Sequence, residues 1–324
     1  MDTEAELVIK KSYIDTKRWD VLATGLYRVL DGLFDNGTLK LKPKNIKIEE
    51  IENENAEEIF ILNLNLKITR RKSNMKTITF PVGYRTNYLV EFLACLEQQN
   101  LEGYTIFCSA EASPACIKIL QESKLDLQIL YKKKSIGRKD HQGAIDNMYN
   151  VLTSAFEAGS TFNVHLEDDF LLSPDAINLA NWYYENFKDR PTTFMSYGLF
   201  GFAPRGDDYT ALEEVPFFEG LGWCTFKEGW EECYNKAWND TELVKKYYNA
   251  WGWDWSVQSF FKEYNYKSLR PLINRTQHNG RVGGTCCTVA HHDQHYTPLK
   301  WNTTERITDF KLTGTSQETA DWIK

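Results

Sequence analysis

Three consecutive carboxylates, Glu167, Asp168 and Asp169, form the stretch of the sequence best suited to chemistry. They follow the apolar run at residues 162–166, so they lie where a strand is expected to end. Adjacent carboxylates near a core repel one another, and a divalent cation that bridges to a substrate diphosphate relieves that repulsion. Oxygen ligands of this kind suit Mg²⁺ or Mn²⁺. The alternative is a solvated acidic turn that caps a helix beginning at residues 173–174.

A single carboxylate, Asp254, lies within the tryptophan-rich stretch at residues 251–255. It is a candidate general base for an acceptor hydroxyl, with the Trp rings shaping the acceptor pocket. In the alternative interpretation the Trp rings belong to the core, and Asp254 caps the helix expected at residues 256–261.

The segment 270–285 is short of apolar residues after Ile273 and rich in glycine and basic groups. Such a composition is typical of a mobile lid, and equally of an ordinary surface loop. As a lid, the segment is expected to bring Arg281 and backbone amides to a diphosphate.

Histidine and cysteine are also present in spacings that bear on metal binding. The cluster at residues 291–295 contains three histidines that match no zinc signature, so we expect a structural or lid role for them. No two of the seven cysteines have CxxC spacing, which favours a reducing compartment without excluding one or two disulfides. The cysteines are Cys95, Cys108, Cys116, Cys224, Cys233, Cys286 and Cys287.

From residue 75 onward, short apolar runs alternate with amphipathic segments. The expected strands are 77–82, 104–108, 127–131 and 162–166, and the expected helices are 87–98, 114–120 and 141–158. This alternation predicts an α/β fold with a mainly parallel, Rossmann-like sheet flanked by helices. In such sheets ligands bind beyond the carboxyl ends of the strands, where the acidic triplet lies.

Residues 1–72 follow a different pattern and predict a small α+β accessory module of unknown role, followed by a catalytic domain at 73–324. The apolar spacing in 19–34 predicts a helix, and alternation predicts strands at 39–42 and 59–68. An acidic segment at 49–58 is expected to separate the strands.

The bulk composition excludes some classes of partner. A net charge of −7 and only short basic runs, at 67–72 and 132–134, argue against a nucleic-acid groove. No apolar run approaches the ~20 residues of a membrane span. The 14% of aromatic residues suits sugar binding, and equally suits a well-packed core.

Several short motifs, in this order, resemble the N-acetylglucosaminyltransferase I family, which adds β1,2-linked GlcNAc to mannose during N-glycan maturation. The resemblance covers roughly residues 79–296. Its marks are Pro81-Val82 with Arg85, the acidic triplet, Ser173-Pro174-Asp175, FFEGLGW at 217–223, Trp253-Asp254-Trp255, Arg270-Pro271, Asn274-Arg275-Thr276 and Asp293-Gln294-His295. The resemblance implies a GT-A fold and an inverting, metal-dependent glycosyltransferase.

The resemblance also implies roles for the acidic triplet and its surroundings. Asp169 would coordinate Mn²⁺ (or Mg²⁺), which in turn holds the diphosphate of a nucleotide-sugar donor, expected to be UDP-linked. Asp168 would face the ribose, and Glu167 would face the donor sugar. Arg85 would lie near the uridine diphosphate. Asp254 would be the catalytic base for direct displacement on a glycan or glycoprotein acceptor.

Two further segments receive roles in the same way. Leu221, Gly222 and Trp223 would line the donor-sugar pocket. Residues 283–285 would belong to a loop that orders over the donor, with Thr285 at the position of a phosphate-contacting serine of the family. The family's histidine that meets the base corresponds to the region of Asp140 and His141.

The chain departs from the family in having no N-terminal membrane helix, and residues 1–72 have no counterpart in it. We therefore expect a cytoplasmic protein if Met1 is the natural start, and a Golgi-lumenal one if the chain is trimmed from a longer protein. Two other classes stay open, a non-catalytic glycan-binding relative and a sugar-phosphate nucleotidyltransferase. The latter would be expected to open with a Gly-rich triphosphate loop, and none is visible near residues 81–84.

Overall fold

The computed structural model describes residues 3–10, 47–52, 58–66, 75–111, 113–132, 140–202, 206–238, 240–248, 250, 252–283 and 287–315. The chain divides into two compact units, Met1–Lys72 and Ser73–Lys324. Some predicted features lie outside the described residues: the helix at 19–34, the strand at 39–42, the basic run at 67–72, most of the run at 132–134, and Thr285.

In the first unit, the described residues form a three-stranded antiparallel sheet of order β1-β3-β2. Its strands are β1 (Thr3–Lys10), β2 (Lys47–Glu52) and β3 (Glu58–Leu66). β3 confirms the strand predicted at 59–68. Within the acidic segment expected at 49–58 to separate the strands, residues 49–52 belong to β2 and Glu58 begins β3.

The second unit is built on a nine-stranded sheet of order β14-β10-β12-β9-β11-β7-β4-β5-β6. One half of it is parallel and contains β4 (Met75–Val82), β5 (Tyr104–Glu111), β6 (Leu127–Lys132) and β7 (Ser160–His165). The central strand β4 is buried from Thr77 to Phe80, because helices cover both faces of the sheet here. All four strands confirm the sequence prediction.

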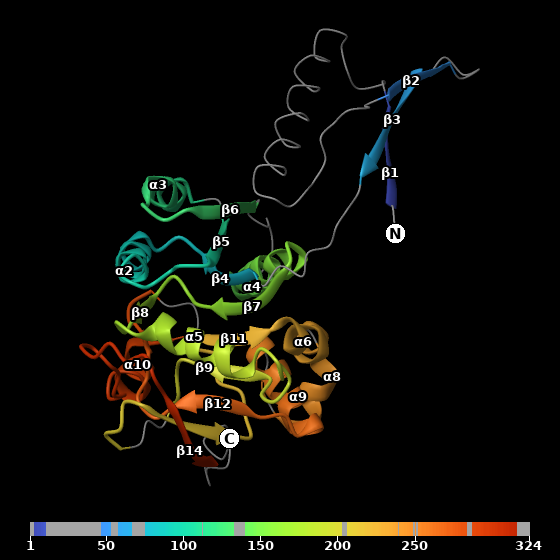
Figure 1. The fold of residues 1–324 in the computed structure, drawn as a ribbon. Helices are drawn as coiled ribbons and strands as arrows, with labels where there is room; N and C mark the ends of the chain where they lie inside the picture. The colour runs from blue at the N-terminus through green and yellow to red at the C-terminus, as the bar shows by residue number, and fades with distance from the viewer. Residues whose placement is uncertain are drawn as a thin grey trace. The chain divides into compact units, whose positions relative to one another are not determined.

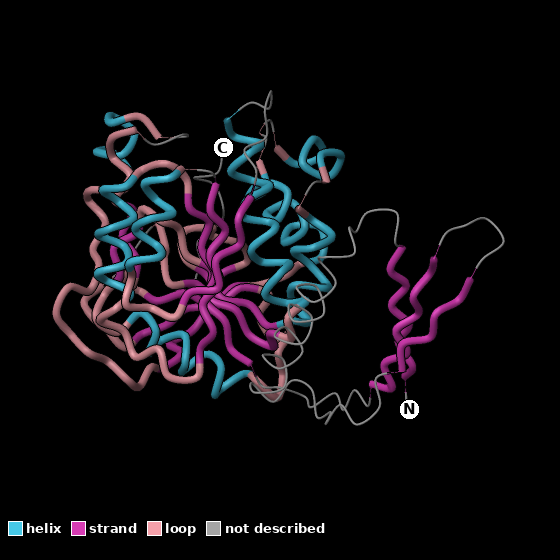
Figure 2. Tube along the Cα trace, turned by 90° about the horizontal axis from the view of Figure 1, so that it is seen from above, coloured by secondary structure: helices cyan, strands magenta, loops and turns pink. Residues whose placement is uncertain are grey.

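Figure 1 shows α2 (Thr86–Leu96) and α3 (Pro114–Glu122) on one side of these strands and α4 (Asp140–Glu157) on the other. These helices confirm the three predicted from amphipathic spacing. Figure 2, viewed from above, shows the twisted strands in the middle of the unit with helices around them. Parallel strands connected by helices place their carboxyl ends on a common edge.

The other half of the sheet is mixed. It contains β9 (Ser196–Gly198), β10 (Ala211–Val215), β11 (Trp223–Phe226), β12 (Ser268–Pro271) and β14 (Lys311–Thr315). β11 runs antiparallel to both β7 and β9, so the parallel order ends beside the strand that precedes the acidic triplet. A separate two-stranded ladder joins β8 (Phe170–Leu172) to β13 (Thr276–His278).

Helices in the second half bury much of the chain's aromatic content. They are α5 (Ala176–Phe187), α6 (Lys227–Gly229), the π-helical turn η3 (Trp230–Tyr234), α7 (Asn235–Ala237), α8 (Thr241–Tyr247), α9 (Trp253–Tyr264) and α10 (Val289–His295). Trp223, Trp230 and Trp238 are buried in one apolar cluster with Tyr234. The aromatic richness of the sequence therefore serves core packing to a large extent.

The second unit thus has the predicted α/β architecture, a mostly parallel sheet flanked by helices, consistent with a Rossmann-like GT-A fold. Among the described cysteines, Cys95, Cys108, Cys116, Cys224, Cys233 and Cys287 carry free thiols. Within the described residues, no helix combines the length and apolar character needed to cross a membrane.

Candidate active site

The acidic triplet lies at the carboxyl edge of the parallel strands. β7 ends at His165, and the Leu166 amide donates to the Thr79 carbonyl (2.9 Å), which extends the pairing with β4 by one residue. Asp168 and Asp169 are only 4% and 3% exposed. The alternative of a solvated acidic turn is therefore wrong, because two of the three carboxylates are buried and need compensating partners.

Those partners come from the loop after β4. The Gly83 amide donates to Asp168 Oδ2 (2.9 Å), and Arg85 Nη2 lies 3.1 Å from Asp168 Oδ1. Arg85 Nη1 lies 2.8 Å from Asp169 Oδ2. The guanidinium, which was expected near a uridine diphosphate, thus bridges the two aspartates. The Arg85 guanidinium also lies over the Tyr88 ring, with its Cζ atom 5.3 Å from the ring centroid.

A side chain of α4 fixes the end of β4. Asn147, which is buried, donates to the carbonyls of Val82 (3.4 Å) and Ser109 (2.9 Å) and accepts from the Ser109 hydroxyl. One side chain therefore ties together the carboxyl ends of β4 and β5, immediately before the loop that carries Arg85.

A second set of partners reaches Asp169 through the ladder between β8 and β13. The register pairs Phe170 with His278, and the Asn279 amide donates to the Asp169 carbonyl (2.8 Å). His278 Nε2 consequently lies 3.6 Å from Asp169 Oδ2. Gly280 packs so closely that an added Cβ would lie 2.4 Å from Asp169 Oδ2.

The atoms around Asp169 suit a divalent cation. Asp169 Oδ1 and His278 Nδ1 are buried, and no described residue forms a hydrogen bond with either atom. A carboxylate oxygen and an imidazole nitrogen are both ligands for Mn²⁺, which in nucleotide sites completes its coordination with phosphate oxygens and water. Among the described residues, no three His, Cys, Asp or Glu side chains converge into a complete protein cage. The residues present therefore fit a cation that completes its coordination with ligands from outside the protein.

Burial and mutual repulsion shift the titration of this cluster. Burial, followed by repulsion from Asp169 and Asp168, raises the pKa of Glu167 well above its usual range. Burial and the nearby Asp169 raise the pKa of Asp168 to about 6, although Arg85 opposes the shift. Burial lowers the pKa of His278, which favours the neutral imidazole. Excess negative charge in a buried site is the condition under which a cation binds favourably.

Asp254 lies in the first turn of α9, and the residue that caps this helix is Gly252. The prediction that Asp254 itself is the N-cap is therefore wrong. Its side chain is exposed, yet surrounding protein atoms limit its hydration and raise the pKa of the carboxyl, while the Trp255 amide hydrogen bond opposes the shift. The Asp254 carboxylate adds a small share to the raised pKa of Glu167.

Tyr296, directly after α10, packs against His278. Its ring lies 4.8 Å from that of His278 (centroid to centroid). Burial raises the pKa of its phenol, and Glu167, Asp254 and Asp169 each add to the shift. A half-buried aromatic ring thus lies within electrostatic reach of both the cation ligands and the candidate base.

The segment after β13, residues 279–283, rests on α2. Tyr88 donates to the Val282 carbonyl (2.9 Å) and accepts from the Val282 amide (3.0 Å), and Asn279 donates to Glu91. Arg281, expected at a diphosphate, forms a bidentate pair with Asp293 at 2.7 and 2.8 Å. Both partners are about half exposed, and such a pair contributes little to stability.

The histidine cluster has a structural member, as expected from its spacing. His292 is buried, and its Nε2 and Nδ1 atoms lie 2.9 Å from the His278 carbonyl and 3.2 Å from Thr297 Oγ1. Both ring nitrogens are therefore engaged in hydrogen bonds that tie α10 to β13.

Gly222 and Trp223, expected in a donor-sugar pocket, lie at the start of β11, where Trp223 pairs with His165 of β7. Trp223 is fully buried, with its ring stacked on Tyr234 at 4.4 Å between centroids. Gly222 has φ +83, and an added Cβ would lie 2.8 Å from Thr276 Cγ2. Glycine is required here both by the backbone conformation and by the close approach of β13.

Sequence reasoning missed three side chains of this site, His278, Tyr88 and Tyr296. None belongs to a recognisable local motif. His278 lies beside Asp169, Tyr88 lies against Arg85, and Tyr296 packs on His278. A weak signal was available for His278, since it precedes Asn279-Gly280, a turn dipeptide that ends a short strand.

Comparison with known proteins gives similarity at the level of fold. No protein-family model matches the chain, and no curated protein matches it in sequence. One similar solved structure is a mannosyltransferase from Pyrobaculum calidifontis in complex with GDP-Man and Mn2+. It is 15% identical in sequence, with a TM-score of 0.39, and the match covers 78% of this chain and 64% of the mannosyltransferase chain. Another is the 1–349 segment of TarS from S. aureus in complex with UDP-GlcNAc. It is 11% identical in sequence, with a TM-score of 0.44, and the match covers 68% of this chain and 61% of the TarS chain. The chain thus spans less than two thirds of the length of either protein.

Proposed function

We propose that this protein is an inverting glycosyltransferase that moves a sugar from a nucleotide-sugar donor, UDP-linked, to a hydroxyl of a glycan. The observation that carries the proposal is the pairing of Arg85 with both Asp168 and Asp169 at the carboxyl edge of the sheet, with Asp254 within electrostatic reach of the triplet. An acidic cluster that would hold a cation, together with a separate candidate base, would supply the two functions that direct displacement requires.

Asp169 and His278 are the residues that would hold a divalent cation, Mn²⁺ or Mg²⁺. When bound, such a cation neutralises negative charge on the diphosphate leaving group. Arg85 supplies a second positive charge from the protein, and the 279–283 segment, docked on Tyr88, covers this side of the site. Exclusion of water by such a segment limits hydrolysis of the donor.

Asp254 would act on the acceptor side. Its carboxylate takes the proton of the acceptor hydroxyl as the oxygen forms a bond to the anomeric carbon. The bond from that carbon to the diphosphate oxygen breaks, and its electron pair leaves with the nucleoside diphosphate. One displacement inverts the anomeric centre. The raised pKa of Asp254 makes it a stronger base than an ordinary aspartate.

The test is Asp254→Asn, which preserves size and removes the base. Transfer should fall by roughly 10²- to 10⁴-fold, the contribution of general base catalysis, while donor affinity stays within about twofold. Glu263→Gln, on the exposed far end of the same helix, serves as the matched control. Unchanged turnover in Asp254→Asn would overturn the mechanism. Binding of a nucleoside triphosphate together with a sugar phosphate would instead indicate a nucleotidyltransferase.

A further inference from the structure

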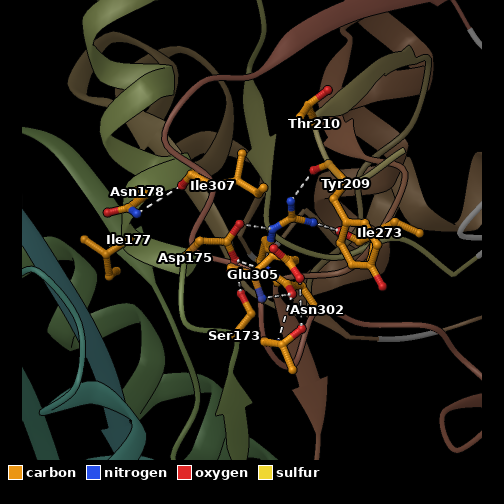
Figure 3. Close-up of polar contacts among 12 residues, drawn as sticks. Ser173, Asp175, Ile177, Asn178, Tyr209, Thr210, Ile273, Asn302, Glu305 and Ile307 are labelled. Carbon is orange, nitrogen blue, oxygen red and sulfur yellow. Dashed lines mark hydrogen bonds and ion pairs between the residues drawn. The ribbon is translucent and has the colours of Figure 1, made fainter. Parts of the chain in front are cut away.

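Two of the sequence motifs have no part in the chemistry above, Ser173-Pro174-Asp175 and Asn274-Arg275-Thr276. The structure joins them in one buried ion pair. Arg275 Nε lies 2.8 Å from Asp175 Oδ2, and both side chains are 0% exposed. Figure 3 shows Asp175 at the centre of this network, pointing toward Asn302.

Both charges of the pair have additional partners. Asp175 Oδ1 accepts from Ser173 Oγ (2.7 Å) and from Asn302 Nδ2 (2.7 Å). The remaining nitrogens of the Arg275 guanidinium donate to the carbonyls of Ile273 and Tyr209. A buried ion pair is tolerated only when its other donors and acceptors are satisfied in this way, and the geometry is then fixed from several sides.

The pair closes one end of the β8–β13 ladder. β13 begins immediately after Arg275, and the Ser173 amide, directly after β8, donates to the Arg275 carbonyl (2.9 Å). At the other end, the Asn279 amide donates to the Asp169 carbonyl (2.8 Å). Asp169 and His278, the proposed cation ligands, therefore emerge from the end of the ladder opposite to the ion pair.

A ladder of two strands with three residues each has little stability of its own. A slip of one residue would turn His278 to the opposite face and remove it from Asp169. Something outside the ladder must fix its register. The buried pair, which joins the residue before β13 to a residue just after β8, is placed to do so.

We propose that Asp175 and Arg275 are positioning residues for the cation site, which fix the register of β8 against β13 and hence the approach of His278 to Asp169. This inference rests on the proposed function, because the cation ligands belong to that proposal. The alternative is a pair that stabilises the fold without affecting the site.

The experiment measures Mn²⁺ binding to the protein alone by electron paramagnetic resonance, together with thermal unfolding, for Asp175→Asn and for the milder Ser173→Ala. Removing partners in the surroundings of a metal site typically weakens affinity by about 10- to 100-fold. We expect a loss of about that size for Asp175→Asn in its folded form and a smaller loss for Ser173→Ala. The double variant Asp175→Leu with Arg275→Met removes both charges and should fold while still binding Mn²⁺ weakly.

The matched control is Glu213→Gln. Glu213 pairs with Arg270, also buried and at 2.8 Å, and this pair joins β10 to β12 rather than β8 to β13. The Glu213→Gln variant should have a lower unfolding temperature than the wild type and an unchanged affinity for Mn²⁺. Folded Asp175 variants that bind Mn²⁺ as tightly as the wild type would overturn the proposal.

A readout that needs no cation separates this inference from the proposed function. Hydrogen exchange of the Asn279 amide reports whether β13 still donates to Asp169. Its protection should fall in Asp175→Asn and persist in Glu213→Gln, and retained protection in Asp175→Asn would overturn the proposal. If the wild type binds no Mn²⁺ either alone or together with a nucleoside diphosphate, the cation site is wrong, and the Asn279 exchange alone then decides whether the pair fixes the register.

Discussion

Nη1 of Arg85 lies 2.8 Å from Oδ2 of Asp169, on the carboxylate oxygen that also faces His278. A guanidinium at this position neutralises part of the charge that a divalent cation would otherwise meet. Arg85 therefore has two opposing effects in the proposed enzyme: it weakens the binding of the cation alone, and it strengthens the binding of a donor diphosphate.

Replacement of this arginine separates the two effects. In Arg85→Gln, we expect Mn²⁺ alone to bind more tightly, on the order of 10-fold, because a competing positive charge is removed. Affinity for the nucleotide sugar should fall in the same variant. Calorimetric titrations with Mn²⁺ and then with donor measure both. Arg281→Gln is the control, since its guanidinium is paired with Asp293, and it should leave the affinity for Mn²⁺ alone unchanged. Weaker Mn²⁺ binding in Arg85→Gln would contradict this account.

The close approach of Gly280 to the cation ligands makes a second prediction. A Cβ at this position would lie 2.4 Å from Asp169 Oδ2 and 2.9 Å from His278 Cε1, so one of them must move. Gly280→Ala should weaken Mn²⁺ affinity by about 10-fold or more, as changes around a metal site do. Gly83→Ala is the matched control, because its Cβ would meet Asp168 Oδ2 at an ordinary 3.9 Å. Equal Mn²⁺ affinities for the two variants would show that Gly280 has no such role.

The raised pKa of Asp254 predicts a pH profile. A base works only when deprotonated, so activity is present above the raised pKa and is lost as pH falls through it. The acid limb of kcat/KM should lie above the usual aspartate value of about 3.9. Measurement of kcat/KM against pH checks this, with Asp254→Asn as the reference that should lack this limb. The idea fails if Asp254→Asn keeps the same acid limb as the wild type.

The buried His165 on β7 makes a prediction about stability. Burial lowers its pKa to about 3, from 6.5 for an ordinary histidine. Below pH 6.5 the unfolded chain binds a proton that the folded chain does not, so folding stability decreases as pH falls from 6.5 toward 3. Between pH 7.5 and 5.5 this costs about 1.4 kcal/mol. Urea unfolding of His165→Gln should lack that loss, while the exposed control His295→Gln should retain it. A wild-type loss equal to that of His165→Gln would rule the effect out.

The parallel half of the fold could be predicted from sequence because its strands are short apolar runs, such as the one from Thr77 to Val82, and its helices have amphipathic spacing. The mixed half was not predicted. β11 and β12 have only four residues each, and pairing between distant short strands leaves no local pattern.

The site could be predicted in part for a similar reason. The triplet and Asp254 stand out by residue type alone. The contacts of Arg85 with Asp168 and of Tyr88 with Val282 join residues 83 and 194 positions apart, which only the folded chain reveals. The same holds for Asp175 and Arg275, whose motifs were visible in the sequence while their pairing was not.

The most direct test of the central claim is a donor panel observed by ligand NMR, with UDP-sugars and GDP-sugars, each in Mn²⁺ and in EDTA, on the wild type and on Asp169→Asn. We predict that one nucleotide sugar binds the wild type in Mn²⁺, and that this binding is lost in EDTA and in Asp169→Asn. Absence of binding by every nucleotide sugar, or binding that neither EDTA nor Asp169→Asn changes, would contradict the account.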